Sequence, residues 1–363
     1  MISLLSLPIS TIRLIFTRFL KIKDISRLDV AYCNHDERDH LLHILSDNKY
    51  IIYDNVVMKG DYHSYHRYTG MLVINPRYDV DYLRYINSAL IWIGKRKVNI
   101  LNLSIQNQDS LTYVGLVGLS QHCKYLQSLT IERCPNISGN SIVELSKKCS
   151  TNLQALSLSD CSGLHDIHVV DFISNCSNIR SLDLSHLKEL NDTGIILIAR
   201  TLQRNLKSLD LECCNKISDF GLIEMGKLCS LEKLTVSYRY DETPQEFLKF
   251  RDFDKVLKFF SNLLSLTIEG SVTNGVHAIG KYCTNLHSLK LLDGQFLEVS
   301  DFVNIDSLCS NLQCIELGGF DAFSKLRRLL PNLQIIDCDN YDNNGDDDDD
   351  DDDSDNNDND NDD

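Results

Sequence analysis

The feature that most constrains this chain is a spacing of apolar residues that recurs ten times. In each copy, two variable residues separate the first two apolar residues, and one variable residue precedes the third. A single copy would mean little, but a spacing that recurs at a nearly fixed interval indicates a repeat architecture. The ten copies begin at Val98, Leu126, Leu153, Ile179, Leu206, Leu231, Leu263, Leu286, Leu312 and Leu333, at intervals of 21 to 32 residues.

Each copy combines two periodicities. The last two apolar residues alternate with variable ones, as in a short strand with one buried face, whereas the residues that follow have helical spacing. Leu222, Met225 and Cys229 are one example of the helical part. A single strand and helix cannot bury their own apolar faces, but stacked units share one core. The sequence therefore predicts an α/β solenoid over residues 98–340, with about ten repeats, parallel strands on the concave side and helices on the convex side.

Cysteines occupy two fixed positions of this repeat. Three come three residues after the last apolar strand residue, namely Cys134, Cys161 and Cys214. Six others end the predicted helices, namely Cys123, Cys149, Cys176, Cys229, Cys283 and Cys309. Together with Ile217–Leu222, which reads I-S-D-F-G-L, the pattern resembles the cysteine-containing class of leucine-rich repeats. The resemblance implies a leucine-rich-repeat fold, in which Ser218 or Asp219 caps the following helix.

The chemistry of the cysteines has two interpretations. The chain has thirteen of them and no Cys-x-x-Cys pair. A zinc site requires ligands that converge on one point, usually from closely spaced pairs of residues. A cysteine that occurs once per turn of a solenoid instead acts as a small buried apolar residue. The spacing favours packing, so no metal or cofactor is expected. Unpaired cysteines also indicate a reducing compartment, and hence a cytoplasmic or nuclear location.

Charge and hydropathy exclude other partners. The formal net charge is -16, but residues 342–363 contain fourteen Asp, which leaves -16 + 14 = -2 for the rest. A near-neutral body has no basic face for nucleic acid, and the acidic stretch, 341–363, is expected to be a disordered tail. Met1–Leu20 imitates a secretory signal, but Arg13 and Arg18 interrupt it. No uncharged apolar run of about twenty residues occurs, so no membrane partner is expected.

Residues 1–46 form a separate predicted module. Apolar residues at helical spacing follow Leu7 and Pro8, and the pattern resembles the F-box, a small all-helical domain. In that family the module docks on the adaptor Skp1 of a cullin-RING ubiquitin ligase. The resemblance implies a docking face made of Leu7, Pro8, Ile12, Ile15, Phe16 and Leu20. The family's usual tryptophan is absent, and the alternative is that these helices only cap the open end of the solenoid.

Residues 47–97 lack the repeat and are rich in tyrosine. Leu83, Ile86, Leu90 and Ile93 recur at helical spacing, which predicts a helix that packs on the first repeat. The tyrosines either pack between the N-terminal module and the solenoid or form a binding surface.

The concave face supplies the candidate site. Asp183, Asp210 and Glu212 lie between or just after the buried apolar residues of two adjacent predicted strands. Their side chains are therefore expected to point to the concave face and to be neighbours there. Like charges this close cost stability unless something offsets them. One hypothesis is that a basic segment of a partner docks there; the other is a solvated polar face. The longest repeat also carries Tyr238, Arg239 and Tyr240, either a binding rim or a plain surface insertion.

No phosphate loop, zinc-protease helix or nucleophile elbow appears in the sequence. We therefore expect a binding protein and not an enzyme. The resemblances favour an F-box-type substrate receptor, with a Skp1-like adaptor and a protein substrate as partners. The alternative is a repeat scaffold without a ligase role.

Overall fold

The computed structural model describes residues 52–59, 71–74, 85–95, 99–121, 123–149, 152–237, 253–270 and 275–339. The F-box-like module with its six docking residues, the segment that carries Tyr238, Arg239 and Tyr240, and the acidic stretch all lie outside the described residues.

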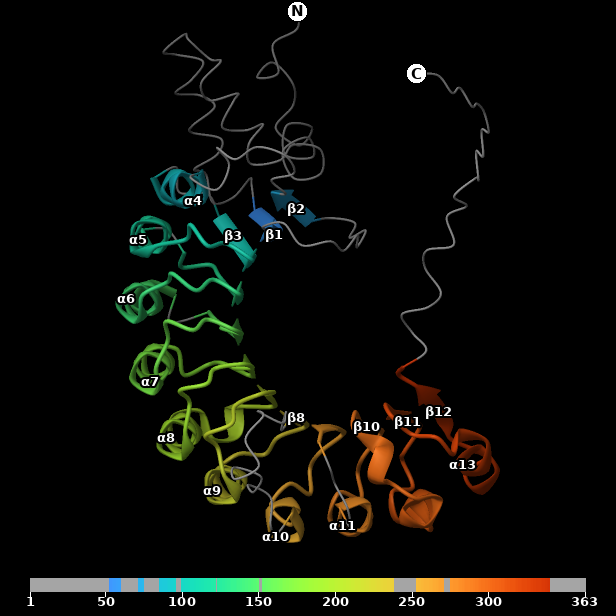
Figure 1. Ribbon diagram of the computed structural model, residues 1–363. Helices are drawn as coiled ribbons and strands as arrows, with labels where there is room; N and C mark the ends of the chain where they lie inside the picture. The colour runs from blue at the N-terminus through green and yellow to red at the C-terminus, as the bar shows by residue number, and fades with distance from the viewer. Residues whose placement is uncertain are drawn as a thin grey trace, which may run out of the picture.

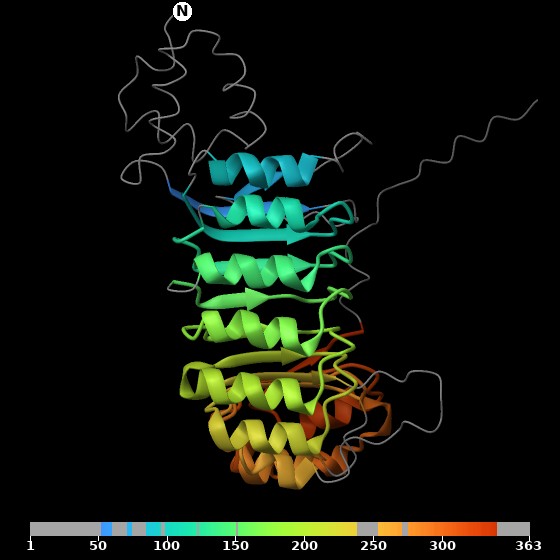
Figure 2. The same ribbon diagram turned by 90° about the vertical axis from the view of Figure 1, so that its left-hand side faces the viewer.

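The described chain is a leucine-rich-repeat solenoid, as predicted. One parallel sheet of twelve strands lines the inside of an arc, and helices cover the outside (Figure 1). From one end to the other, the order is β12-β11-β10-β9-β8-β7-β6-β5-β4-β3-β1-β2. The helices lie side by side across the convex face (Figure 2). Because a helix is wider than the spacing of about 4.8 Å between strands, the stack curves toward its strands.

The strands are β1 (Ile52–Lys59), β2 (Met71–Ile74), β3 (Asn99–Gln106), β4 (Ser128–Glu132), β5 (Ala155–Ser157), β6 (Ser181–Asp183), β7 (Ser208–Leu211), β8 (Lys233–Ser237), β9 (Ser265–Glu269), β10 (Ser288–Leu291), β11 (Cys314–Leu317) and β12 (Gln334–Asp337). The α-helices are α4 (Tyr85–Lys95), α5 (Tyr113–Ser120), α6 (Gly139–Cys149), α7 (Asp166–Asn175), α8 (Asp192–Leu202), α9 (Asp219–Leu228), α10 (Phe253–Leu257), α11 (Gly275–Tyr282), α12 (Ile305–Leu308) and α13 (Phe323–Leu329). Short 3-10 turns, namely Gln203–Asn205, Gly294–Phe296 and Val299–Phe302, complete three connections.

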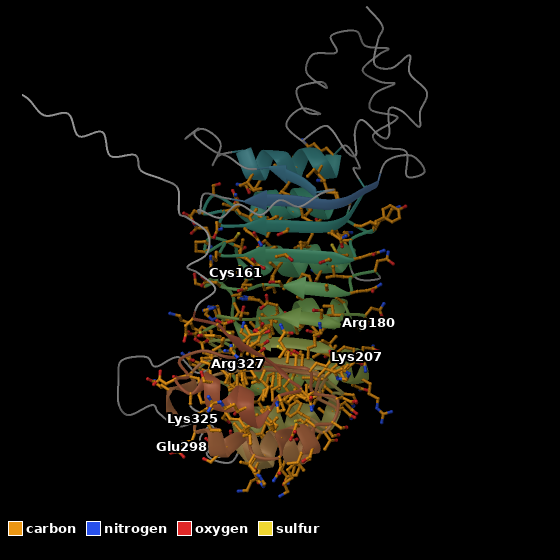
Figure 3. All side chains as sticks on the ribbon, turned by 90° about the vertical axis from the view of Figure 1, so that its right-hand side faces the viewer. Cys161, Arg180, Lys207, Glu298, Lys325 and Arg327 are labelled. Atoms are coloured by element: carbon orange, nitrogen blue, oxygen red, sulfur yellow. The ribbon has the colours of Figure 1, made fainter. Side chains whose placement is uncertain are left out.

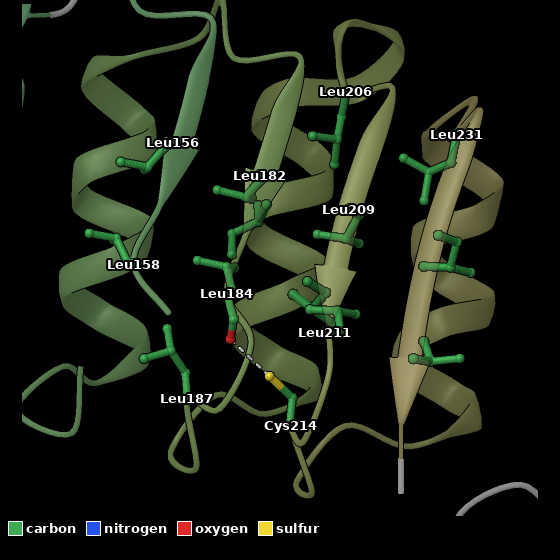
Figure 4. Close-up of a cluster of buried hydrophobic side chains, with 14 of the residues drawn as sticks. Leu156, Leu158, Leu182, Leu184, Leu187, Leu206, Leu209, Leu211, Cys214 and Leu231 are labelled. Carbon is green, nitrogen blue, oxygen red and sulfur yellow. Dashed lines mark hydrogen bonds between the residues drawn. The ribbon is translucent and has the colours of Figure 1, made fainter. Parts of the chain in front are cut away.

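The predicted apolar triplets form the core. In the eight units from Leu126 to Leu317, all three apolar residues are buried. In the centre of the stack, Leu182 and Leu209 lie on neighbouring strands in register, and their side chains point toward the helices (Figure 4). Each fully buried leucine stabilises the fold by about 1.5–3 kcal/mol. The leucine ladder is therefore what joins the units into one body.

The first and last triplets were assigned in the wrong register. Strand β3 pairs Leu103 with Leu129, so the first inward triplet is Ile100, Leu103 and Ile105, two residues later than predicted from Val98. Strand β12 pairs Ile335 with Ile315, one residue earlier than predicted from Ile336. In β3 the spacing fits twice, at Val98-Leu101-Leu103 and at Ile100-Leu103-Ile105, so the apolar pattern alone does not decide between registers two residues apart. In β12, Ile335 and Ile336 are adjacent, and a shift by one residue exchanges the two faces of a strand.

The sheet extends beyond the first repeat, which the sequence did not predict. Strand β1 pairs in parallel with β3 on one side and with β2 on the other, and both strands come from the tyrosine-rich connector. Helix α4 buries Ile86, Leu90 and Ile93, the residues whose spacing predicted a helix there. It packs closely on α5, since a side chain at Gly94 would overlap the backbone of Gly118.

The cysteines pack in the core, as their spacing predicted. Of the turn cysteines, Cys161 donates its thiol to Ile131 O at 3.4 Å and Cys214 to Leu184 O at 3.1 Å, each carbonyl one strand back. Burial raises the pKa of Cys134 and of Cys214 to about 12. These thiols therefore stay protonated, and those of Cys161 and Cys214 serve as hydrogen-bond donors between repeats, whereas Cys134 donates to Glu132 O in its own repeat.

A second connection links the starts of α8 and α9 to the repeat before each of them. The Asp192 carboxylate at the start of α8 accepts the Ser218 backbone N–H at 2.7 Å and the Ser218 hydroxyl at 2.5 Å. Ser218 in turn caps α9, as predicted, by accepting the Phe220 N–H at 3.2 Å. A side chain at Gly221 would clash with the Asp192 carboxylate, which explains the glycine in this motif. Asp166 makes the equivalent bond to the Asn191 N–H, at 3.2 Å.

Candidate binding surface on the concave face

Alternation along the strands decides which side chains reach the concave face. Residues between the buried leucines, such as Asp183 and Asp210, point away from the helices, and these two are paired in register on β6 and β7. Glu132 ends β4, and Glu212 follows β7. We call these four residues, Glu132, Asp183, Asp210 and Glu212, the acidic strip. Figure 3 shows the strands from the open side of the arc, with Arg180 and Lys207 at the edge where strands begin and Cys161 at the edge where they end.

Hydroxyl and amide groups separate the first carboxylates of the strip. The Ser157 hydroxyl on β5 donates to Asp183 Oδ2 at 2.8 Å and lies 3.4 Å from Glu132 Oε1. Gln106 Nε2, from β3, donates to the other oxygen of Glu132 at 2.7 Å. The strip is thus continuous from β3 to β6 through hydrogen bonds.

Asp183 and Asp210 also accept hydrogen bonds from residues that follow them at the end of the same strand. Asp183 Oδ1 accepts the Ser185 N–H at 3.0 Å and the Ser185 hydroxyl at 2.7 Å. Asp210 Oδ1 accepts the Glu212 N–H at 2.9 Å in the same way. The two aspartates therefore have fixed orientations and present their remaining lone pairs to the concave side.

Burial and like charges change the acidity of the strip. Burial, together with the charges of Asp183 and Glu212, raises the pKa of Asp210 to about 6, against the hydrogen bonds from the Glu212 N–H and from Thr235. Burial also raises the pKa of Glu132, with a further contribution from the charge of Asp183. A negative charge on either carboxyl group therefore has a free-energy cost, because desolvation and repulsion disfavour the charged form.

Cations offset only part of this cost within the described part of the chain, where the charge of Arg133 lowers the pKa of Glu132 and Glu212 interacts with the charge of Lys290. There, Glu132, Asp183 and Asp210 form no ion pair with lysine or arginine, and Glu212 Oε1 lies 3.5 Å from His186 Nε2. An array of fixed acceptors with net negative charge suits a cationic ligand, above all one that brings its own N–H donors.

The structure brings the three predicted concave residues together, since Asp183, Asp210 and Glu212 lie on β6 and at the end of β7. Three further members of the network, Gln106, Glu132 and Ser157, were not singled out from the sequence. Gln106 was missed because the first repeat was placed two residues too early, so Asn102 and Ser104 were expected at its edge of the sheet. Across the described ranges, no helix is long and apolar enough to cross a membrane.

Comparisons with known proteins extend this description only a little. No family model matches the chain. Antagonist of mitotic exit network protein 1 of Candida glabrata is 31% identical over 116 residues, which are 31% of this chain and 22% of that protein. The alignment thus spans less than a quarter of that relative's length.

Two solved structures are similar in fold. The complex of Rad7 and Elc1 in yeast superposes with a TM-score of 0.43 and 15% identity, over 90% of this chain and 90% of the other. The leucine-rich repeat-containing protein LegL7 of Legionella pneumophila gives 0.44 and 15%, over 66% of this chain and 84% of that one. The assignment of the fold rests on the strand order and the buried triplets described above.

Proposed function

We propose that this chain is a non-catalytic protein-binding subunit whose acidic strip holds a basic segment of a partner. The observation that supports this most directly is that Asp183 and Asp210 are paired in register without a lysine or arginine beside them among the described residues. A bound guanidinium or ammonium group would offset the repulsion between them and return the pKa of Asp210 toward its ordinary value.

The spacing of the strip sets the size of the ligand. From β4 to β7 there are three strand spacings of about 4.8 Å, or about 14 Å in all. An extended chain rises about 3.3 Å per residue, so about four residues cross the strip. A segment with two or three lysines or arginines within about five residues therefore matches it best. Arginine fits better than lysine, because its planar donors pair with two carboxylate oxygens at once.

A charge-reversal experiment tests the proposal. The full-length chain is used to recover partners from a cell extract, and each recovered protein is quantified for the wild type, for Asp210→Lys/Glu212→Lys and for a control. The control, Glu144→Lys/Lys147→Glu, exchanges an exposed ion pair on the convex helix α6 and keeps the net charge. We expect the first variant to lose partners that carry a basic segment and the control to keep them. Equal recovery by all three chains rejects the acidic strip as the binding site.

The finer part of the proposal is a role as the substrate-recognition subunit of a Skp1-cullin ubiquitin ligase, in an intracellular location. Its support is the resemblance of residues 1–46 to the F-box, joined to a repeat array of the kind that holds substrates in that family. Without an adaptor, the same chain is a repeat scaffold whose N-terminal helices only cap the solenoid.

Co-purification with Skp1 separates these two functions. We expect the wild type to retain Skp1 and Ile15→Asp/Phe16→Asp to lose it. A matched control places the same changes on the convex side, Val114→Asp/Ile167→Asp, where both side chains are exposed, and keeps Skp1. If the wild type recovers no Skp1, the ligase role is rejected, while the acidic-strip proposal stands on its own experiment.

A further inference from the structure

One position of the repeat presents a side chain at the strand-end edge of the sheet in successive turns. Two residues after the last buried strand residue, the backbone is left-handed in five consecutive units, with φ between 51° and 59°. The five residues are Asn107, Arg133, Asp160, His186 and Cys213. Because each turn stacks on the next, neighbours in this column interact. Arg133 Nε, for example, lies 3.9 Å from Asp160 Oδ2.

The last two members of the column bring together three metal-binding groups. The ligand atoms of His186, Glu212 and Cys213 all lie within 4.8 Å of one another, and His186 Nε2 is 3.5 Å from Glu212 Oε1. The two turns are tied by their backbone, since the His186 N–H donates to Glu212 O at 2.6 Å. The three side chains therefore converge from two adjacent turns that are fixed relative to each other.

These separations match the geometry of bound zinc. With Zn–N and Zn–O distances near 2.0–2.2 Å and Zn–S near 2.3 Å, the edges of a tetrahedral site are about 3.3–3.6 Å. The His186–Glu212 edge already has this length, and the two edges to the thiol need to close by about 1 Å at most. One imidazole, one carboxylate and one thiolate form a ligand set typical of zinc, and the thiolate disfavours magnesium and calcium.

The surroundings also suit a cation. His186 and Glu212 have about a third of their side-chain surface exposed, 34% and 35%, so an ion has access from solvent. Cys213 is 8% exposed. The acidic strip lies beside the cluster, since Asp210 accepts the Glu212 N–H, and its negative potential favours the entry of a divalent ion.

We propose that His186, Glu212 and Cys213 form a zinc-binding site with one coordination position open to water. This inference goes beyond the proposed function and stands without it, and it departs from the metal-free chain expected from the cysteine spacing. That expectation considered the cysteines that point into the core, whereas Cys213 belongs to a different column of the repeat.

The adjacent cysteine provides a contrast within the same turn. The Cys214 thiol points into the core and donates to Leu184 O (Figure 4), and burial raises the pKa of this thiol to about 12. A metal ligand must be deprotonated, so Cys214 is unsuited to the role although it lies one residue away. Substitution of the two cysteines therefore distinguishes a thiolate ligand from general damage to the turn.

Cobalt(II) is the probe of choice, because a cobalt–thiolate bond gives a charge-transfer absorption band in the near ultraviolet. The metal-free full-length chain is titrated with Co²⁺, and Zn²⁺ is then added. We expect a thiolate band that saturates at one ion per chain and disappears when Zn²⁺ displaces Co²⁺. The Asp-rich segment 342–363 has no thiol, so Co²⁺ bound there contributes nothing to the band.

The variants assign the ligands. Cys213→Ser is expected to remove the band and His186→Asn to weaken Co²⁺ affinity more than tenfold, while asparagine keeps the left-handed turn, as Asn107 does in an earlier repeat. Cys214→Ser is expected to keep the band. If Cys214→Ser fails to fold, as judged by circular dichroism, Cys338→Ser at the other end of the sheet serves as the thiol control. Absence of the band in the wild type, or its persistence in Cys213→Ser, overturns the proposal. Because no partner takes part, this outcome is independent of the binding experiment.

Discussion

The two halves of the concave face use the same positions of the repeat in opposite ways. In the half from β4 to β7, Glu132, Asp183 and Asp210 accept hydrogen bonds from hydroxyl and amide groups, and they form no ion pair with lysine or arginine among the described residues. In the half from β8 to β11, Glu316 lies 3.1 Å from Lys290 Nζ in an ion pair. Both halves stand on the same leucine ladder. The fold therefore does not determine which side chains occupy the concave face, and the excess of negative charge in one half comes from the side chains and not from the backbone.

The largest effect that sharpens this comparison is on partner binding. Raising the ionic strength from about 0.05 M to about 0.5 M shortens the screening length from about 14 Å to about 4 Å. Three ion pairs worth about 0.7 kcal/mol each would be lost on screening, which would weaken binding about thirtyfold. Titration calorimetry with a basic peptide from a recovered partner measures this dependence. Glu132→Gln/Asp210→Asn should flatten this dependence, and the convex control Glu144→Lys/Lys147→Glu should not. A salt-independent affinity would contradict the role of the acidic half.

Next in size is the effect of Asp210→Asn on stability. The carboxyl of Asp210 has a pKa of about 6 in the folded chain against an ordinary 3.8, so the folded state holds more protons between these pH values. Stability therefore falls as the pH rises from about 4 to about 6 and is lower from there upward. Asparagine keeps the acceptor without the charge. After allowance for solvent screening, we expect it to raise the free energy of unfolding at pH 7 by about 1–2 kcal/mol.

Urea unfolding at pH 7 and at pH 4 checks this expectation, because the gain should disappear at the lower pH. Asp171→Asn on the convex helix α7, where the side chain is exposed, is the matched control and should change stability by less than about 0.5 kcal/mol. A destabilised Asp210→Asn would mean that the charge supports the fold, and the case for an unsatisfied binding site would weaken.

A smaller effect is expected from the hydroxyl that separates two carboxylates. Ser157→Ala removes the donor 2.8 Å from Asp183 and leaves Glu132 and Asp183 without it, which should cost about 1 kcal/mol. Ser288→Ala on β10, in the half that holds the Lys290–Glu316 ion pair, is the control and should leave the free energy of unfolding nearly unchanged. If thermal unfolding gives equal losses for the two variants, the hydroxyl has no special role between the charges.

The smallest effect on stability is expected from the Lys290–Glu316 ion pair, in the half from β8 to β11. Lys290→Gln breaks the contact with Glu316, whose side chain is partly exposed, and should cost between about 0 and 1 kcal/mol. The same urea series measures it. A loss above about 2 kcal/mol would show that the pair stabilises its half strongly, so that the two halves would differ in energy as well as in charge.

Much of this architecture could be predicted because the repeat specifies it more than once. In the eight inner units the period of the triplets, the helical spacing and the cysteine positions agree, so Leu182 or Leu209 could face only inward. The ends lack this redundancy. In β3 the triplet spacing fits in two registers, and in β12 Ile335 and Ile336 are adjacent, so only the pairing with the neighbouring strand decides between the alternatives. Strands β1 and β2 pair without a repeat pattern of their own.

The candidate sites were predictable to different degrees for the same reason. Asp183 and Asp210 share a strand position, so the period places them side by side. Ser157 becomes important only because it lies between two carboxylates, and the convergence of His186 with Cys213 depends on left-handed turns that the hydropathy pattern does not reveal. Sequence spacing gives the register of a side chain; its direction comes from the backbone around it.

The bond from Asp192 to Ser218 gives the stack a polarity. Asp166 and Asp192 each hold the cap residue of the following helix, Asn191 and Ser218, so a unit that melts removes a support from its successor's cap and leaves its own predecessor's cap residue bound. Nearest-neighbour coupling in this solenoid is therefore asymmetric, and disorder that begins near the N-terminal end should spread forward more readily than disorder that begins at the C-terminal end spreads back. When a unit between α7 and α9 is excised or duplicated, the new junction should therefore keep an aspartate at the start of one helix opposite the cap residue of the next helix.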